Sequence, residues 1–339
     1  MGRWADNPEK AADELMRRSL EGIALSGRLL LVNQHGDLPA LLCSRGAGPQ
    51  VWNRRSGGGT EPQPWPPAGP FETALVRLPK ARDEQDMTLH AALSVLQPEG
   101  RLILYGGNDE GIRSAATRLS ALCGAADTLA ARGHGRVVAA ARPEEIAGLK
   151  SELSQWRTVA THTIAGVGRP WVSYPGLFAA GRIDEGTALL ISTLSPVPAG
   201  ARVLDFGCGT GVIAAAVLAA SPGARLDMMD EDTLALEAAR ENVPGANILL
   251  GRSLSDAGKQ LYRAIVSNPP LHQGIAETHA SLERLVREAP AHLAPGGTLQ
   301  IVVQRRVPLD GLLAQIGTDV KVVAENGRYR VWRVAARGP

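Results

Sequence analysis

Aromatic residues are scarce in this chain of 339 residues, at 4% of the total, and cysteine occurs only three times. The low aromatic content argues against a platform on which single-stranded nucleic acid would stack. Cys43, Cys123 and Cys208 are scattered and odd in number, so they indicate neither a disulfide framework nor a metal site. The seven histidines are dispersed as well, and we therefore expect no bound metal.

Long apolar runs are also missing. No stretch approaches the roughly 18 apolar residues needed to cross a bilayer. The first stretch, "MGRWADNPEKAADELMRRS", contains acidic residues and no apolar signal-peptide core. Together with the cysteine usage, which fits a reducing compartment, these absences predict a cytoplasmic protein without a membrane partner. The net charge of +2 neither demonstrates nor excludes a polyanionic partner, because local patches matter more than the sum.

The chain is too long for one ordinary core, which predicts two domains. Apolar runs that resemble strands alternate with helical segments in both halves, so we expect an α/β fold with mostly parallel sheets. The last two strands, "KVVAEN" and "RYRVWRV", are expected to pair as an antiparallel hairpin. The pattern loosens between about residues 150 and 175, where Gly and Pro interrupt it. We place the domain connection there, which gives domains at 1–165 and 166–339.

The individual elements follow from the same pattern. We expect strands at 27–36, 73–80, 101–107, 201–207, 224–230, 246–251, 263–268 and 298–304, and helices from Pro8 and at 86–96, 110–123, 184–193, 211–221, 231–243 and 276–292. The stretch 55–70 is rich in Gly and Pro and is expected to be a surface loop.

A glycine-rich loop is the most informative stretch. "VLDFGCGTGV" (203–212) places Gly207, Gly209 and Gly211 between a predicted strand and a predicted helix. Glycine lets a ligand approach the backbone closely and permits unusual dihedral angles. The spacing G-x-G-x-G differs from the G-x-G-x-x-G dinucleotide fingerprint. Asp205 precedes the loop, and a carboxylate there suits an ammonium group better than a pyrophosphate, which it would repel.

A second acidic residue, Asp230, ends the next predicted strand, 25 residues after Asp205. An acid at this position can accept hydrogen bonds from both ribose hydroxyls of a nucleoside. These features together fit S-adenosylmethionine, with Asp205 and the glycine loop at the methionine end and Asp230 at the ribose. The alternative role for Asp230 is the N-cap of the following helix, and one residue can serve both roles.

Residues 267–274, "SNPPLHQG", follow the apolar run at 264–266. Proline cannot continue a central strand because it lacks the N–H donor, so the strand ends sharply there. The carboxyl ends of strands are where open α/β sheets bind their ligands.

An Asn-Pro-Pro sequence at this position is typical of methyltransferases that act on a planar nitrogen, which is a weak nucleophile because its lone pair is delocalised. The side-chain carbonyl of Asn268 and the backbone carbonyl of Pro269 can accept the two N–H bonds of such an amine and aim its lone pair at the methyl group. Pro270 fixes the loop, and positioning of this kind supplies most of the barrier reduction without a strong general base. Leu271 offers apolar contact to the base, whereas His272 either stacks on or hydrogen-bonds to it or caps the next helix.

The second half of the chain resembles the bacterial small-subunit (16S) ribosomal RNA guanine-N2 methyltransferase family. The matching stretches include "YPGLFAAGRIDEGTALLISTL" (174–194), "VLDFGCGTGV" (203–212), "SNPPLHQG" (267–274), "LAPGGTLQIV" (293–302) and "NGRYRVWR" (326–333). The first half matches more weakly, mainly through "LILYGGNDEGIRSA" (102–115).

This resemblance implies two tandem class I methyltransferase-like (Rossmann-like) domains, of which the first is degenerate and assists RNA binding or supports the second. In agreement, "LLLVNQHGDLPALL" (29–42) stands where a glycine loop would be and keeps only Gly36, and "RLPK" lacks an Asn-Pro-Pro. The implied reaction is rRNA methylation: transfer of a methyl group from S-adenosylmethionine to N2 of a guanine in ribosomal RNA, with 16S rRNA, free or within the small subunit, as the expected substrate.

Four positions depart from the usual family pattern. Leu271 replaces a Phe, Ser253 replaces an Asn or Asp near the adenine, and Gln304 and Leu309 replace an Asn and a Tyr. These departures bear on the choice of target more than on the type of reaction.

The candidate site residues fall into three groups. We assign catalysis to Asn268, Pro269, Pro270 and His272, substrate contact to Leu271, Arg305 and Arg306, and the cofactor site to Asp205, Phe206, Gly207, Cys208, Gly209, Gly211, Asp230, Glu231, Arg252, Ser253 and Asn268. Arg305 and Arg306 follow a strand and are expected on the same rim as Asn268, where they bind RNA phosphates or remain solvated surface residues.

Other functions remain open at this point. The chain could methylate a large-subunit rRNA guanine, a DNA adenine or a protein glutamine, or could be a non-catalytic RNA-binding or assembly protein. Enzymes for DNA and for proteins usually have an aromatic residue after Asn-Pro-Pro and lack a tandem degenerate domain. The intact Asp205, Gly207, Gly209, Asp230 and Asn268 argue against a dead site.

Overall fold

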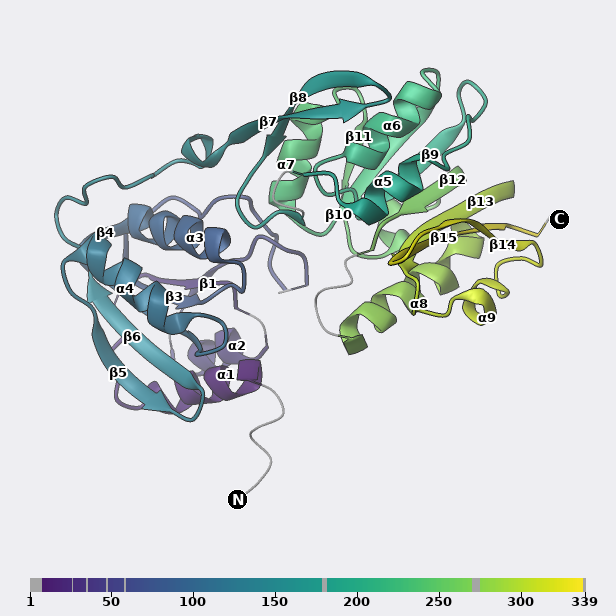
Figure 1. Cartoon of the computed structure of the whole chain (residues 1–339). Helices are drawn as coiled ribbons and strands as arrows, with labels where there is room; N and C mark the ends of the chain where they lie inside the picture. Colours follow the sequence, from purple (N-terminus) through teal and green to yellow (C-terminus); the bar gives the residue numbers. More distant parts are fainter. Residues whose placement is uncertain are drawn as a thin grey trace. The chain divides into compact units, whose positions relative to one another are not determined.

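The computed structural model describes residues 8–25, 27–34, 36–46, 48–57, 59–178, 182–269 and 275–337, without the side chains of 8–10 and 275–279. The chain divides into two compact units, Met1–Arg157 and Thr158–Pro339, which Figure 1 shows in purple to teal and in teal to yellow. Each unit holds its own sheet covered by helices. The predicted α/β fold with mostly parallel sheets and a C-terminal antiparallel hairpin is confirmed.

The first unit is built on a six-stranded sheet. In spatial order its strands are β2 (Gln50–Trp52), β1 (Leu29–Val32), β3 (Phe71–Arg77), β4 (Leu96–Gly107), β6 (Gly135–Ala141) and β5 (Asp127–Arg132). The first four are parallel, whereas β6 and β5 are antiparallel to their neighbours. One face packs against α1 (Pro8–Ser19) and α2 (Leu38–Ser44), and the other against α3 (Arg82–Val95) and α4 (Ile112–Cys123). A short 3₁₀ helix, η1 (Leu153–Trp156), ends the unit.

The second unit repeats this plan with one more strand. The spatial order is β11 (Asn247–Leu250), β10 (Arg225–Asp230), β9 (Arg202–Phe206), β12 (Tyr262–Ser267), β13 (Leu293–Gln304), β15 (Tyr329–Ala335) and β14 (Val320–Glu325). The strands from β11 to β13 are parallel, and β15 and β14 close the sheet as an antiparallel pair.

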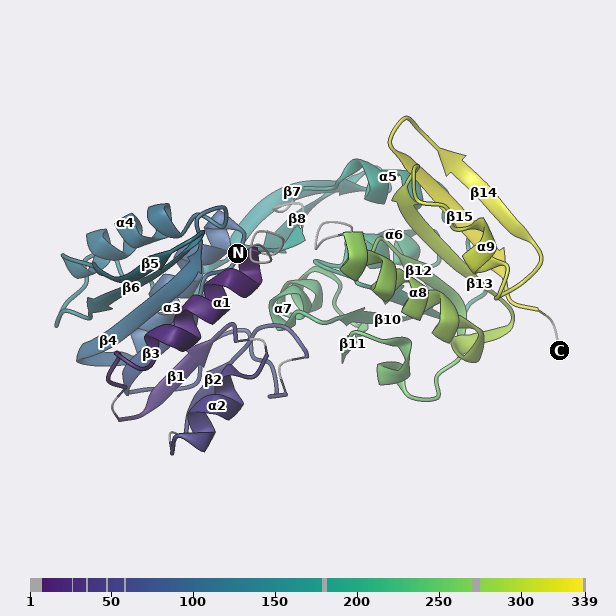
Figure 2. The same ribbon diagram turned by 90° about the horizontal axis from the view of Figure 1, so that it is seen from below.

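Helices cover both faces of the second sheet. The helices α5 (Glu185–Ile191), α6 (Val212–Ala220) and α7 (Thr233–Asn242) pack on one face, and α8 (Ile275–His292), α9 (Asp310–Leu313) and the 3₁₀ helix η3 (Leu254–Ala257) pack on the other. Figure 2 shows α8 in front of this sheet and α6 behind it. Adjacent residues of β12 face the two cores in turn, Ile265 towards α8 and Val266 towards α6. Burial on both faces explains why these strands are continuous apolar runs.

A two-stranded hairpin occupies the stretch that the sequence pattern predicted to be a loose connection. β7 (Thr158–Ile164) and β8 (Val167–Ser173) pair antiparallel and pack through the buried Ile164 and Trp171 on the core of the second unit. The division between the two units does fall in this stretch, but the hairpin was not predicted, because Gly166 forms its turn, with a φ of 78°, and Pro170 is tolerated in a strand of a two-stranded ribbon. The predicted domain boundary between 165 and 166 falls in this turn.

The two sheets correspond strand by strand, including a shared irregularity. β3 pairs with β4 through Phe71↔Leu96 and, after a register shift, Thr73↔Arg101; β12 pairs with β13 through Tyr262↔Leu293 and, after a shift, Ala264↔Thr298. Thr73 therefore corresponds to Ala264, and four residues further on Arg77 corresponds to Asn268. β1 pairs with β3 through Leu29↔Thr73, and β9 pairs with β12 through Val203↔Ala264, so Leu29 corresponds to Val203. Two and four residues further on, Leu31 stands at the position of Asp205 and Asn33 at the position of Gly207.

Candidate functional site

The site lies at the carboxyl ends of three neighbouring strands, β10, β9 and β12. Val266 pairs with Asp205, so Asn268 and Gly207 each follow two residues after a paired position. The hydroxyl of Ser267 donates to the carbonyl of Phe206 at 2.7 Å, which joins the two strand ends directly. The structure therefore brings the Asn-Pro-Pro segment and the glycine loop together at one edge of the sheet.

The glycine loop is held in a left-handed conformation at three positions. Gly207, Gly209 and Gly211 have φ values of 72°, 53° and 86°, which only glycine adopts without strain. The amides of Gly207 and Cys208 donate to the carbonyl of Met229 at 2.8 and 2.9 Å, and this fixes the loop to β10. A Cβ atom at Gly207 or Gly209 would meet no atom of the described residues within 4 Å, so the loop presents open backbone at these two positions.

Two segments outside the motif also hold the loop. The indole N–H of Trp171 donates to the hydroxyl of Thr210 at 2.9 Å, and the Nδ2 of Asn242 donates to the carbonyl of Thr210 at 3.0 Å. Asn242 also exchanges hydrogen bonds with the backbone of Val172. Sequence reasoning missed these residues because they are 39 and 32 positions away from Thr210 and belong to no motif.

Asp205 is fully buried at the end of β9. Its Oδ2 accepts a hydrogen bond of 2.9 Å from the amide of Ala214, whereas its Oδ1 has no hydrogen-bond partner among the described residues. Burial, with a smaller contribution from the charge of Asp230, raises the pKa of Asp205 to about 7. A buried carboxylate oxygen without a donor is costly, so Asp205 is suited to a cationic or N–H-bearing ligand group.

Asp230 ends β10 and faces the glycine loop. Its Oδ2 accepts from the amide of Gly209 at 2.8 Å, and its Oδ1 accepts from the amide of Asp232 at 2.9 Å. Burial and the neighbouring charge of Asp232 raise the pKa of Asp230 to about 6. The N-cap of α7 is Asp232 and not Asp230, since the side chain of Asp232 accepts from the amide of Leu234. The helix-cap alternative for Asp230 is therefore wrong.

The other predicted cofactor residues surround these two acids. Phe206 is half-buried and packs on the core below α8, and Cys208 is a buried loop residue whose thiol pKa is raised by burial. Glu231 forms an ion pair with Arg252 at 3.9 Å. Ser253 caps η3 and contacts the Oε2 of Glu288 at 2.7 Å through its hydroxyl. These contacts give Ser253 a role within the protein, and its contact with an adenine stays a prediction.

Asn268 follows β12, and its side chain is turned towards the start of α5. Its Nδ2 donates to the Oγ1 of Thr187 at 2.8 Å and to the Oδ2 of Asp184 at 3.2 Å. Both bonds involve the nitrogen end of the amide, so the carbonyl end is turned away from α5. Pro269 is buried directly after it. The predicted roles of Pro270, Leu271 and His272 lie outside the described residues.

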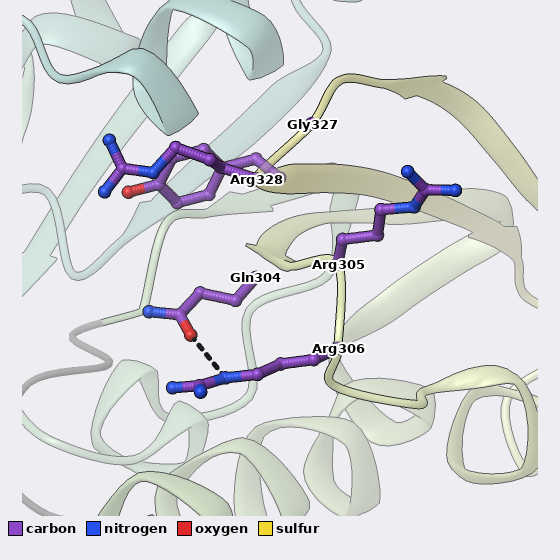
Figure 3. A pocket seen from close by; sticks show the side chains of 6 residues that line it. Gln304, Arg305, Arg306, Gly327 and Arg328 are labelled. Atoms are coloured by element: carbon purple, nitrogen blue, oxygen red, sulfur yellow. Dashed lines mark hydrogen bonds between the residues drawn. The ribbon is translucent and has the colours of Figure 1, made fainter.

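A basic pocket lies at the same edge of the sheet, at the ends of β13 and β15. Its volume is about 510 Å³, and it is lined by Gln304, Arg305, Arg306, Gly327, Arg328 and Tyr329. Figure 3 shows the three arginines around this pocket, with the Nε of Arg306 bonded to the Oε1 of Gln304 at 2.9 Å. We call this group of residues the arginine pocket. Arg305 and Arg306 were predicted here, but Arg328 was not, because it lies in the turn between β14 and β15 and reaches the pocket only through the pairing of Tyr329 with Gln304.

The arginine pocket is connected to Asn268 through the first residues of α5. Glu185 accepts from the Nδ2 of Asn326 at 3.0 Å and contacts the Nη1 of Arg328 at 3.5 Å. Asp184, the neighbouring residue, contacts Asn268. The arginine pocket and Asn268 therefore belong to one continuous rim of the second unit.

Among the residues of the first unit that the structure describes, the corresponding edge carries different side chains. Leu31 and Asn33 take the positions of Asp205 and Gly207, and Arg77 takes the position of Asn268. The guanidinium of Arg77 forms two hydrogen bonds of 2.7 Å with Glu110, and its Nε contacts Asp13 at 3.0 Å. A paired arginine is a donor and cannot accept the N–H groups of an amine.

The donor set of the second unit fits S-adenosylmethionine. The unpartnered Oδ1 of Asp205 matches an ammonium group, Asp230 presents carboxylate oxygens for hydroxyls, and the open glycine backbone permits close approach. No group of three or more metal-ligating side chains occurs among the residues that the structure describes. In the same part of the chain, no helix is both long and apolar enough to span a bilayer.

Two protein-family models match this chain, one in each of its two units. Residues 170–333 match the "Methyltransferase small domain", and residues 60–136 match the "Methyltransferase small domain N-terminal". The match to the first unit is thus to a companion domain of the methyltransferase family.

Individual relatives align with about four fifths of the chain. The ribosomal RNA small subunit methyltransferase C of Pseudomonas aeruginosa (strain LESB58) is 34% identical over 277 residues, which are 78% of this chain and 80% of the relative. The protein of the same name from Stutzerimonas stutzeri is 33% identical over 293 residues, or 85% and 86% of the two chains.

A solved structure has the same fold from end to end. It is a T. thermophilus 16S rRNA N2 methyltransferase in complex with AdoMet and guanosine, and it superposes with a TM-score of 0.83 over 99% of this chain and 93% of the other. At 22% identity, this likeness establishes the tandem methyltransferase-like fold of both units.

Proposed function

Since this chain belongs to the family of the ribosomal RNA small subunit methyltransferase C, we propose that the site at the ends of β9, β10 and β12 performs the reaction of that family. The chain is an S-adenosylmethionine-dependent 16S rRNA guanine-N2 methyltransferase. Family membership overturns the alternatives of a DNA-adenine or protein-glutamine enzyme. The residue roles below are our proposal, and the observation that carries them is the contact between the ends of β9 and β12.

The cofactor site consists of Asp205, Asp230 and the glycine loop. Asp205 binds the ammonium group of the cofactor through its free Oδ1, and Asp230 accepts from the ribose hydroxyls. The open backbone at Gly207 and Gly209 lets the cofactor lie against the loop. When bound, the cofactor supplies an electrophilic methyl group on a positively charged sulfur.

Asn268 and Pro269 hold the guanine amine. The Oδ1 of Asn268 and the carbonyl of Pro269 accept its two N–H bonds, which orients the nitrogen lone pair towards the cofactor site across the Ser267–Phe206 contact. Placing reacting atoms about 3–3.5 Å apart in the correct orientation supplies a large part of the rate enhancement. The extruded guanine then needs no strongly basic side chain beside its amine, because the amine loses its proton only after methyl transfer has made the nitrogen cationic.

The arginine pocket binds the RNA backbone next to the target base. Arg305, Arg306 and Arg328 place three guanidinium groups on one rim, and the side chains of Arg305 and Arg328 are 54% and 74% exposed. Guanidinium groups bind phosphate by charge-assisted hydrogen bonds and carry no sequence information, so they position the strand while Asn268 selects the amine.

The first unit assists this reaction without binding a cofactor of its own. Its strand ends carry Leu31 and Arg77 where the second unit has Asp205 and Asn268. Leucine cannot bind an ammonium group, and arginine cannot accept the N–H groups of an amine. We assign 1–165 a role in RNA binding or in supporting the second domain, 166–339.

The test is methylation of 16S rRNA by the purified chain. Unmethylated transcript and small subunits from cells lacking the gene are incubated with S-adenosylmethionine that carries a labelled methyl group, and the modified nucleoside is mapped. We expect N2-methylguanosine at one position of 16S rRNA. Absence of transfer to both substrates, or label on adenine or protein, would refute the proposed function.

A further inference from the structure

The amide of Asn268 is held from behind by two side chains at the start of α5. Its Nδ2 lies 2.8 Å from the Oγ1 of Thr187 and 3.2 Å from the Oδ2 of Asp184. The hydroxyl of Thr187 itself donates to the Oδ2 of Asp184 at 2.5 Å. Asp184 and Thr187 are 84 and 81 positions away from Asn268, so no local motif reveals this contact.

The chemistry of these groups permits one orientation of the amide. A carboxylate only accepts hydrogen bonds, so Asp184 must face the NH₂ end of Asn268. Thr187 has a single hydroxyl hydrogen, which it gives to Asp184, and its oxygen must therefore accept from Asn268 as well. An amide turned the other way would place its carbonyl oxygen against a carboxylate.

We propose that Asp184 and Thr187 are positioning residues that fix the amide of Asn268 with its carbonyl oxygen towards the substrate amine. This inference rests on the proposed function, because the orientation matters only if the Oδ1 of Asn268 accepts from the guanine N2. A freely turning amide would present its NH₂ group to the amine for part of the time, donor against donor. Asp184 and Thr187 therefore keep the carbonyl end of the Asn268 amide towards the substrate before the substrate binds.

Asp184 is itself anchored in the protein. Its Oδ1 accepts from the amides of Gly186 and Thr187 at 2.9 and 3.2 Å, which makes it the N-cap of α5. The start of this helix lies close to β15, since a Cβ atom on Gly186 would lie 3.0 Å from the Cδ1 of Tyr329. One carboxylate oxygen thus holds the helix and the other orients the amide of Asn268.

One oxygen of Asp184 caps the helix and the other contacts Asn268, so an isosteric substitution of Asp184 can test the second contact alone. Asn is as good an N-cap as Asp, and in Asp184→Asn the side-chain oxygen must stay on the helix amides. The new NH₂ group then replaces the Oδ2 and faces Thr187 and Asn268, which drives the amide of Asn268 to turn over. We expect kcat for methyl transfer to fall roughly tenfold to hundredfold, as for a misplaced reacting group. The Kd for S-adenosylmethionine, the KM for RNA and the Tm stay close to wild type.

A matched pair at Thr187 separates orientation from packing. Thr187→Ser keeps the hydroxyl and retains activity, whereas the isosteric Thr187→Val removes it and lowers kcat. In the background of Asn268→Ala, Asp184→Asn produces no further loss, because there is no amide left to orient. A merely structural role of Asp184 would lower activity by the same factor in both backgrounds.

Nuclear magnetic resonance of the full chain with ¹⁵N-labelled asparagine gives a readout that does not require activity. The NH₂ pair of Asn268 is assigned by its loss in Asn268→Ala and is expected to exchange slowly in the wild type and to shift in Asp184→Asn. Unmoved resonances together with wild-type kcat in Asp184→Asn overturn the positioning role. A wild-type chain that methylates no RNA refutes the proposed function instead, while the resonances still decide whether Asp184 orients the amide.

Discussion

The hydroxyl of Ser267 donates a hydrogen bond of 2.7 Å to the carbonyl of Phe206, and it thereby joins the last residues of two adjacent parallel strands. The next residues along the chain are Asn268 and Gly207. The bond therefore holds Asn268, to which we assign the target amine, beside the glycine loop, to which we assign the cofactor. Both follow strands of a sheet that is buried on both faces, and positional catalysis needs groups held in place in this way.

Substitutions at two glycines, one in the glycine loop and one outside it, distinguish the effect of backbone strain from the effect of lost cofactor contact. Gly207 and Gly200 have nearly the same φ, 72° and 78°, and a Cβ atom at either would meet no described atom within 4 Å. We expect Gly207→Ala and Gly200→Ala to lower the free energy of unfolding by a similar amount, about 1–2 kcal/mol, from left-handed strain. Only Gly207→Ala weakens S-adenosylmethionine binding, because its methyl group points into the cofactor site. Calorimetry on both variants checks this, and equal cofactor affinities would count against the loop assignment.

Cofactor affinity depends on pH through the two buried acids. Their pKa values are about 7 for Asp205 and about 6 for Asp230, both raised mainly by burial. An ammonium group beside Asp205 favours the ionised carboxylate, so binding below about pH 7 must first remove a proton. The affinity for S-adenosylmethionine therefore rises from about pH 5 to about pH 7 and then levels off. Titration calorimetry across this range tests whether the affinity rises with pH, and an affinity that falls with pH would contradict the proposed role of the two acids.

The arginine pocket contributes to RNA affinity and not to cofactor affinity. Removing a phosphate contact lowers the slope of log K against log salt by about 0.7–0.9 for each contact. We expect Arg328→Ala and Arg305→Ala each to weaken 16S rRNA binding and to reduce this slope, with S-adenosylmethionine binding unchanged. Arg225→Ala is the control, since Arg225 is exposed at the opposite end of β10. Filter binding at several salt concentrations compares them, and equal slopes in all variants would exclude the pocket from the RNA interface.

We expect one chain to bind one cofactor. The first unit has Leu31, Asn33 and Arg77 at the positions of Asp205, Gly207 and Asn268, and Arg77 is paired with Glu110. Calorimetry is expected to give a stoichiometry of one S-adenosylmethionine per chain, and Asp205→Ala abolishes all of it. A second site, or binding that survives Asp205→Ala, would show that the first unit retains a cofactor pocket.

Sequence patterns predicted most of the fold and the two motifs of the site, for identifiable reasons. The strands β9, β10 and β12 are continuous apolar runs because they are buried on both faces. After β9 the run ends at Gly207, Gly209 and Gly211, where the positive φ values favour glycine. The β7–β8 hairpin was missed because Gly166 and Pro170 resemble the punctuation of a loop.

The remaining site residues could not be predicted because they depend on strand register and on distant contacts. Asp184 and Thr187 reach Asn268 across more than 80 residues of sequence, and Arg328 reaches the pocket only because β15 pairs antiparallel with β13. The sequence placed "RLPK" opposite the Asn-Pro-Pro segment, but only the strand register shows that Arg77 itself takes the position of Asn268. Sequence motifs identify groups that carry chemistry, whereas the groups that orient them are visible only in three dimensions.

The role of Asn268 is tested by single-turnover methyl transfer with the Asn268→Ala variant, with cofactor affinity measured on the same preparation. We expect S-adenosylmethionine binding to stay near wild type while the rate of transfer to 16S rRNA falls about 10²–10³-fold, because a preorganised acceptor of the reacting amine is lost. Asn108→Ala in the first unit serves as the control and keeps the wild-type rate. Near-normal turnover of Asn268→Ala would show that Asn268 does not orient the target amine.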